Sequence, residues 1–281
     1  MRKNKGVTCM GKTGSKRLSA IMATLFFFVM VTVNGLANAL PLNGVNTGQL
    51  SDEIPNLFVP AGITFAIWGL IYIMLLCYVI AVLIAAFGKK GSSLWDSKDG
   101  WLFSINSLLN TVWIFAWHWR MVGLSLVLML GILASLIFLL ESGFKSTEKT
   151  KLEKTDQALG EKVRDFFLWQ PILVYLGWIC VATIANVTAL LVTVGWNGFG
   201  LPALWWTVAV IVVGTVIGIL LVAKRGAVAS GLVVIWAYAG IIMKRNAVDP
   251  ELTMPIIIVA IAGAIAVLAV IVYKLVARRK S

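Results

Sequence analysis

The sequence predicts an all-α, polytopic membrane protein, and three observations lead to that fold class. Hydrophobic residues make up 60% of the 281 residues, and the mean hydropathy of +0.93 lies well above that of a soluble domain. Several apolar runs are long enough to cross a bilayer as helices. These runs are continuous and do not alternate between apolar and polar residues, which argues against a transmembrane β-barrel.

The apolar runs predict eight spanning helices, with boundaries good to a few residues. They lie at 18–40, 59–87, 101–119, 122–141, 167–192, 204–223, 227–243 and 254–273. Because the number of spans is even, both termini are expected on the same side of the membrane.

The first span follows a basic tail, residues 1–17, and admits two interpretations. It ends close to Ala37 and Ala39, which could mimic a signal-peptide cleavage site. The run is longer than a signal-peptide core, however, and Asn34 and Asn38 share a helix face that is suited to packing. We therefore favour a retained first helix over a cleaved signal.

The net charge of +12 is explained by orientation in the membrane. Basic residues gather on alternate connections, namely the N-terminus, residues 88–100, residues 142–166, Lys224 with Arg225, and the C-terminus. The opposite connections hold only three basic residues, Arg120, Lys244 and Arg245. This positive-inside pattern predicts cytoplasmic termini and contact with anionic membrane lipid. We expect a multi-pass protein of the plasma membrane and no nucleic-acid partner.

Three of the predicted spans carry uncharged stripes of aromatic and amide side chains. Offsets of three, four and seven residues put each set on one helix face. Interfacial anchoring or packing would explain any one of these residues, but three helices repeat the arrangement. An unpaired amide in hydrocarbon is costly, so the faces should turn inward, toward one another or toward a large, flat, mostly apolar ligand. The predicted ligand-binding residues are Trp68, Tyr72, Asn110, Trp113, Trp117, Tyr175, Trp178, Ala182 and Asn186.

The sequence contains no motif of a soluble enzyme, so we predict no catalytic and no metal-binding residue. No P-loop or dinucleotide fingerprint occurs. The single histidine, His118, has no Cys, Asp or Glu beside it, and we expect an interfacial histidine rather than a ligand to a metal or to haem iron. No charged residue lies in the middle of a span, which argues against ion-coupled transport.

The last three spans are rich in Val, Ile, Ala and Gly and lack the stripes. Gly214 and Gly218 form a GxxxG pattern, which indicates close helix packing within the chain or between protomers. On the outer side, the loop at 41–58 directly precedes the Trp68 stripe. A lid over a cavity and an ordinary surface loop are equal alternatives for this segment.

The stripes resemble the TspO/MBR family, the tryptophan-rich sensory proteins that include the translocator protein (peripheral benzodiazepine receptor). The family motifs of helices two, three and five are matched in order and spacing by Pro60 to Tyr72, by Leu109 to Trp117 and by Tyr175 to Asn186. The resemblance covers residues 18–192.

This resemblance implies a five-helix bundle that binds porphyrins and other apolar ligands, often as a homodimer. It divides the chain into a basic cytoplasmic tail (1–17), the five-helix bundle (18–192) and a membrane extension of three additional helices (193–281). It also implies that Trp68 and Trp178 are the two tryptophans that take part in ligand binding and porphyrin photodegradation.

The resulting hypothesis is an integral membrane ligand-binding protein that acts as a sensor, carrier or regulator. Its ligand would be a protoporphyrin IX-like porphyrin, haem or a similar apolar molecule, and no cofactor is required. Two alternatives stay open, a light-dependent tetrapyrrole-degrading enzyme and a membrane permease subunit that uses the last three spans as a scaffold.

Overall fold

The computed structural model describes residues 4–88, 95–152 and 159–280, and these residues form helices, 3-10 turns and connecting loops without a strand. The predicted all-α fold class is therefore confirmed. The long helices are α1 (Asn4–Ala39), α3 (Ile67–Phe87), α4 (Ser97–His118), α5 (Val122–Leu152), α6 (Leu159–Thr193), α7 (Ala203–Arg225), α8 (Val228–Val248) and α9 (Met254–Lys280). The short elements are α2 (Thr47–Glu53), η1 (Leu42–Gly44), η2 (Gly62–Ala66) and η3 (Gly198–Gly200).

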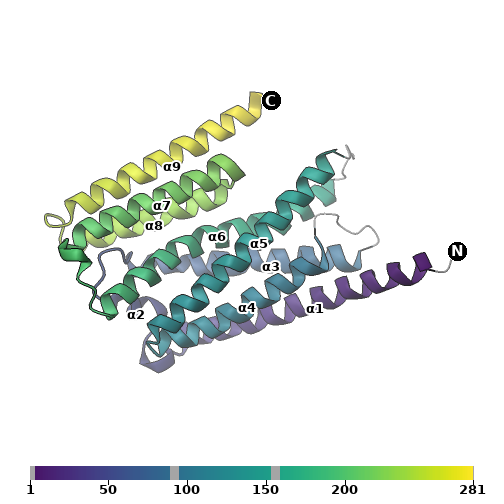
Figure 1. The fold of residues 1–281 in the computed structure, drawn as a ribbon, viewed down its shortest axis with the longest axis horizontal. Helices are drawn as coiled ribbons and strands as arrows, with labels where there is room; N and C mark the ends of the chain where they lie inside the picture. Colours follow the sequence, from purple (N-terminus) through teal and green to yellow (C-terminus); the bar gives the residue numbers. More distant parts are fainter. Residues whose placement is uncertain (1–3, 89–94, 153–158, 281) are drawn as a thin grey trace.

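Seven of the long helices are apolar and long enough to cross a membrane, and α4 is the one that is not among them. Polar residues lower the hydropathy of α4, but Asp99, Asn106, Asn110 and His118 are all buried. The helix packs along α1 and α5 inside the bundle (Figure 1). Its amides bond to neighbouring helices, Asn106 to Ser135 of α5 and Asn110 to Tyr175 of α6, as expected of amides in a bilayer.

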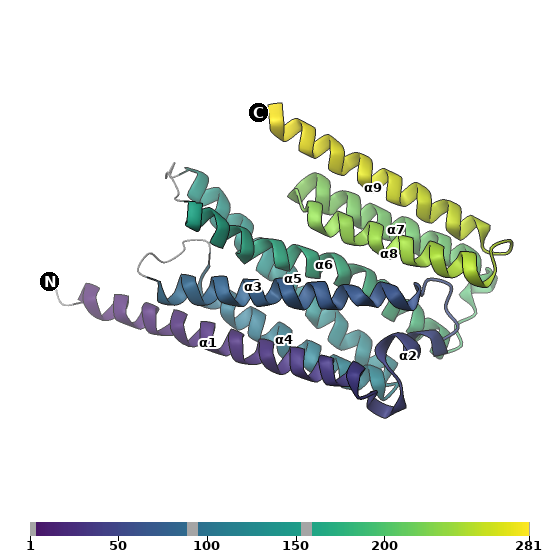
Figure 2. The same cartoon turned by 180° about the vertical axis from the view of Figure 1, so that it is seen from behind.

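The long helices run alternately up and down, so the N- and C-terminal ends lie at the same end of the molecule (Figures 1 and 2). Helices α1 and α3 to α6 form one bundle, and α7, α8 and α9 form a second layer beside it. The two layers meet mainly where α8 packs on α6. The short helix α2 lies at the end opposite the termini (Figure 2).

The contact between α6 and α8 depends on small residues. A Cβ atom placed on Gly177 would come within 2.8 Å of the Cα atom of Ser230. The hydroxyl of Ser230 donates a 2.6 Å hydrogen bond to the carbonyl of Leu173. Close backbone approach and an interhelical hydrogen bond are the two devices that hold helices together in lipid.

The GxxxG pattern of α7 is used within the chain. Gly214 faces the phenol of Tyr238 on α8, and Gly218 faces Val234 of α8 and Val267 of α9. Tyr238 donates a 2.6 Å hydrogen bond to the carbonyl of Ile211. Of the two interpretations of this pattern, the structure therefore shows packing inside one protomer.

Asn34 and Asn38 lie on the face of α1 that the sequence predicted for packing. Asn34 is buried and donates a 2.9 Å hydrogen bond to Oδ1 of Asn110 on α4. Asn38 donates to the carbonyl of Asn34, and its Oδ1 accepts from the backbone of Thr47. These bonds tie α1 to α4 and to the start of α2.

Candidate functional site

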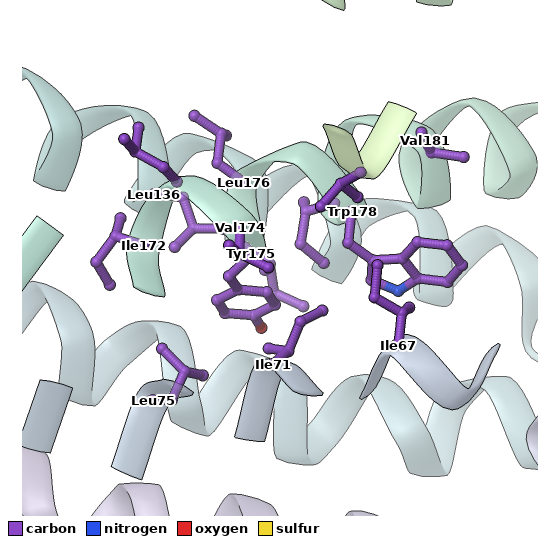
Figure 3. Close-up of a cluster of buried hydrophobic side chains, with 14 of the residues drawn as sticks. Ile67, Ile71, Leu75, Leu136, Ile172, Val174, Tyr175, Leu176, Trp178 and Val181 are labelled. Atoms are coloured by element: carbon purple, nitrogen blue, oxygen red, sulfur yellow. The ribbon is translucent and has the colours of Figure 1, made fainter. Parts of the chain in front are cut away.

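The aromatic stripes of α3, α4 and α6 meet in the interior, with the indole of Trp68 at the centre. The centroid of the Trp68 ring lies 5.6 Å from Tyr72 on its own helix and 6.2 Å from Trp113 on α4. It lies 5.9 Å from Tyr175 and 6.2 Å from Trp178, both on α6. These are the separations and mainly edge-on or offset geometries that aromatic pairs prefer. Figure 3 shows Tyr175 and Trp178 pointing from α6 toward the α3 residues Ile67 and Ile71.

A cavity of about 40 Å³ lies beside Trp68, toward the end of the bundle that carries α2. Its walls come from α2, the segment before α3, and helices α3, α4 and α6. None of the described residues that line it carries a charge. They are Thr47, Ser51, Ile54, Val59, Pro60, Phe65, Trp68, Trp113, Trp117, Trp178, Val181, Ala182, Ala185, Asn186 and Ala189.

The predicted site residues divide into two groups. Those that line the cavity are Trp68, Trp113, Trp117, Trp178, Ala182 and Asn186. The other three, Tyr72, Asn110 and Tyr175, lie behind the lining.

The three residues behind the lining hold the helices that carry the indoles. Asn110 donates a 2.7 Å hydrogen bond to the phenol oxygen of Tyr175, and Asn110 itself accepts from Asn34. This chain of side chains joins α1, α4 and α6 and satisfies amides that would be costly if unpaired in hydrocarbon. The ring of Tyr72 stacks on Trp68 with an interplanar angle of 23°.

Asn186 is the only amide that lines the cavity among the described residues. Its Oδ1 accepts a 2.6 Å hydrogen bond from the hydroxyl of Ser125 on α5. Its Nδ2 donates to the carbonyl of Ala182, one turn earlier, over 3.3 Å. The amide is therefore oriented by α5, which the sequence pattern of α6 alone did not indicate.

Two buried indole N–H groups of the cavity lining have no hydrogen-bond partner among the described residues. They belong to Trp113 and Trp178. By contrast, the indole of Trp117 donates to the carbonyl of Thr47 over 3.4 Å. A buried donor without a partner costs about 1–3 kcal/mol, so an acceptor atom that came within hydrogen-bond distance of either N–H would stabilise the site.

The residues from 41 to 53, here called the lid, cover the cavity at the end opposite the termini. An Asn46 cap with reciprocal bonds to Gln49 begins α2 within this lid. Thr47 and Ser51 face the cavity. Of the two interpretations left open by the sequence, the structure shows an ordered covering segment.

His118 is buried beneath the lid and lies within hydrogen-bond distance of it, whereas the sequence predicted an interfacial histidine. The ring is fully buried, with one nitrogen 3.2 Å from Oγ1 of Thr47 and the other 3.0 Å from the carbonyl of Leu42. The sequence could not show this because the partners lie more than seventy positions earlier in the chain. Arg120 adds a 2.6 Å ion pair with Glu53 at the surface of the lid.

Residues 54–66, here called the wall segment, connect the lid to α3 and are held by α8. The backbone N–H of Ala61 donates a 2.9 Å hydrogen bond to the carbonyl of Gly240, and the indole of Trp236 donates to the carbonyl of Thr64 over 3.0 Å. Lys244 of α8 also forms an ion pair with Asp52 in the lid. The second layer of helices therefore contacts two of the elements that enclose the cavity.

Together, the fold and the site define a helical multi-pass membrane protein with an uncharged, tryptophan-lined cavity under a lid. The chain matches the family model for TSPO-like protein over residues 20–273 and belongs to that family. The match extends beyond the stripes and includes α7 and α8 and most of α9. Searches of the curated proteins and of the solved structures returned no match.

Proposed function

We propose that this TSPO-like protein binds a porphyrin, or a similar flat and mostly apolar molecule, in the tryptophan-lined cavity, and acts as a sensor, carrier or regulator. The observation that carries the proposal is the convergence of indoles from three helices on one uncharged cavity. Aromatic faces give a flat ligand large contact areas at low entropic cost.

The polar atoms of the lining indicate where such a ligand would be held. The unpaired N–H groups of Trp113 and Trp178 would donate to carboxylate or carbonyl oxygens of the ligand. Asn186, oriented by Ser125, adds a neutral polar group on the same side of α6. Without a charged partner in the lining, the ligand's apolar area must supply most of the affinity.

The size of the cavity requires that it open before a macrocycle binds. Its volume of about 40 Å³ holds about three water molecules at 10–15 Å³ each, whereas pockets for drug-sized ligands measure roughly 300–1,000 Å³. Trp68 is only partly buried, and the lid is held through hydrogen bonds and surface ion pairs. Ring movement at Trp68 together with displacement of the lid would enlarge the space between α3, α4 and α6.

The test is a titration of the purified protein with protoporphyrin IX. We expect saturable quenching of tryptophan fluorescence and a saturable change in the porphyrin absorbance. The double variant Trp68→Ala/Trp178→Ala should lose at least tenfold in affinity, which corresponds to about 1.4 kcal/mol. The matched control is Trp205→Ala, because Trp205 is exposed on α7 and outside the cavity. An unchanged dissociation constant in the double variant would contradict the assigned site.

Light-dependent degradation of the bound tetrapyrrole is a second candidate, favoured by the contacts among the aromatic rings. Trp68 touches Tyr72 and Trp113, and Trp113 stacks on Trp117 at 6.1 Å. Cleavage of the macrocycle to a bilin is an oxidation, for which dissolved dioxygen would be the oxidant, and the contiguous indole and phenol rings could take part as electron donors close to the macrocycle. Illumination of the complex should then produce a new bilin-like absorbance, whereas bleaching at the rate of free porphyrin in detergent would exclude this activity.

For the orientation we propose cytoplasmic termini in the plasma membrane, as the basic connections predict. The terminal helices end at the same end of the molecule, which agrees with both termini on one side of the membrane (Figure 1). In a cysteine-free background, Phe199→Cys at the opposite end should react with a membrane-impermeant maleimide in intact cells, because Phe199 is 81% exposed. Labelling of Phe199→Cys only after permeabilisation would show that the termini lie on the outer side and would contradict the proposed orientation.

A further inference from the structure

A second cavity of about 220 Å³ lies outside the tryptophan site, near the η3 turn. It is enclosed by the wall segment, the end of α6, the η3 turn and the start of α7. It is larger than the space at Trp68, and none of the described residues that line it carries a charge. We call this space the vestibule.

The vestibule and the tryptophan cavity share two walls. In the wall segment, Ile54, Val59 and Pro60 line the tryptophan cavity, while the residues between them, 55–57, line the vestibule. On α6, Ala185 and Ala189 face the first space and Thr188 faces the second. A shift of residues 54–60 would therefore join the two cavities.

Among the described residues, one side-chain hydrogen bond holds residues 54–60 against α6. Nδ2 of Asn56 donates to Oγ1 of Thr188 over 2.6 Å. The side chain of Asn56 also accepts a 2.9 Å hydrogen bond from the backbone of Phe58, which shapes the turn. Net hydrogen-bond energies are about 0.5–1.5 kcal/mol, so thermal motion can break this bond without unfolding the bundle.

Aromatic side chains gather at the η3 end of the vestibule, as is typical of a membrane interface. The rings of Trp196 and Trp206 lie 4.8 Å apart, and Trp206 donates a 2.8 Å hydrogen bond to the carbonyl of Gly198. Phe199 packs on Trp196 at 5.4 Å and is largely exposed. Tryptophans anchored in this way concentrate at the boundary between headgroups and hydrocarbon, so we expect this end of the vestibule to lie where an apolar molecule dissolved in the bilayer would reach the protein.

We propose that the vestibule is the first binding site on the path of the ligand, a flat, mostly apolar molecule that enters from the bilayer. The molecule then passes the Asn56–Thr188 hydrogen bond and reaches Trp68. This inference rests on the proposed function, because it uses the same ligand and adds its route. The uncharged lining and the greater volume of the vestibule suit transient occupancy by such a molecule before the tryptophan cavity opens.

The test measures association and dissociation rates separately from the dissociation constant. A substitution at a site that lies only on the route should change both rates by the same factor. The probe is protoporphyrin IX, mixed with the full-length protein in stopped flow. Val210→Phe adds bulk to the vestibule lining, and we expect association and dissociation rates to fall about tenfold while the dissociation constant is unchanged. Val213→Phe is the matched control, since Val213 lies one turn away on the same helix and is 51% exposed.

A second variant acts in the opposite direction. Thr188→Val keeps the shape of the side chain but removes the acceptor of the Asn56 hydrogen bond. Both rates should rise severalfold, again without a change in the dissociation constant.

Three outcomes would overturn the proposal. Unchanged rates in both variants, with normal equilibrium quenching, would show that the ligand takes another route and would leave the tryptophan site intact. A larger dissociation constant in Val210→Phe, caused by faster dissociation with an unchanged association rate, would mean that the vestibule is the final binding site. If the unaltered protein shows no saturable quenching, the proposed function fails and the route fails with it.

Discussion

The two layers of this protein are held together by different means, although both sit in the same apolar solvent. The bundle of α1 and α3 to α6 joins its helices through buried amides and stacked aromatic rings, as in the chain from Asn34 through Asn110 to Tyr175. The layer of α7, α8 and α9 has many glycine contacts, such as Gly218 against Val267, and the hydrogen bond from Tyr238 to Ile211 adds to them. In the first layer, bulky aromatic and amide side chains keep the helices apart and leave the space of the tryptophan cavity. In the second layer, small residues let the helices approach closely.

The second layer, which lacks the aromatic stripes, also contacts the segments that enclose the tryptophan cavity. Its α8 helix bonds to the wall segment at Ala61 and Thr64 and reaches the lid through Lys244. The tryptophan cavity is therefore formed by the first layer and enclosed with the help of the second. Variants at the contacts within the first layer and between the two layers should disturb this arrangement to different degrees.

The largest effect is expected from Gly240→Ala. The added Cβ would come within 1.9 Å of Oγ1 of Thr64, so α8 or the wall segment must move. Overpacking of this kind costs up to about 3 kcal/mol. It should also weaken porphyrin binding, because Thr64 directly precedes Phe65 in the chain, and Phe65 and Trp68 line the cavity. Thermal unfolding in detergent and the porphyrin titration would measure the two effects.

Gly69→Ala is the matched control for this substitution, because a Cβ at Gly69 meets nothing within 4 Å. It should be neutral or slightly stabilising, since Ala favours a helix interior by up to about 1 kcal/mol over Gly. Equal effects of the two variants would show that α8 does not constrain the wall segment.

An intermediate effect is expected from Asn110→Leu, which tests the polar contacts of the first layer. The substitution removes two hydrogen bonds: Tyr175 loses the donor that Asn110 supplied, and Asn34 keeps only its bond to the carbonyl of Met30. We expect a loss of about 2 kcal/mol in the free energy of unfolding, since interhelical bonds in membranes are worth about 0.6–1.7 kcal/mol each. Tyr175→Phe removes only one of the two bonds and should cost about half as much. A neutral Asn110→Leu would contradict the role assigned to this chain of side chains.

The smallest effect is expected from Lys244→Met, which removes the ion pair between α8 and the lid. The acid partner, Asp52, is about half exposed, so the pair should contribute less than about 1 kcal/mol and weaken with added salt. A double-mutant cycle with Asp52→Asn would measure the coupling in low and high salt. A coupling well above 1 kcal/mol that salt does not reduce would mean that the lid is held more tightly than its exposure indicates.

The sequence predicts much of the fold, because helix formation and hydropathy depend on residues that are close together in the chain. Length and hydropathy locate the long helices, and offsets of three and four residues place Trp68, Trp113 and Trp178 on faces that do meet in the structure. The polarity of α4 did not prevent its recognition, since its amides lie on one face.

The remainder of the site depends on contacts between distant parts of the chain. Helical spacing assigns Asn110 and Tyr175 to inward faces but cannot show that they bond to each other and lie behind the lining. His118 was misjudged because its partner Thr47 belongs to a lid whose position only the fold defines. The contact of Gly240 with the wall segment involves its backbone, which leaves no side-chain pattern to recognise.

The central claim is that a flat ligand stacks among the indoles of the first layer and pairs with their free N–H groups. Indole N–H spectroscopy by NMR, with isotope-labelled tryptophan and assignment through single Trp→Phe variants, tests it most directly. Titration with protoporphyrin IX should move the signals of Trp113 and Trp178 saturably and with one common dissociation constant, while the signal of Trp205 stays in place. Bound porphyrin that leaves the signals of Trp113 and Trp178 unmoved would contradict the account.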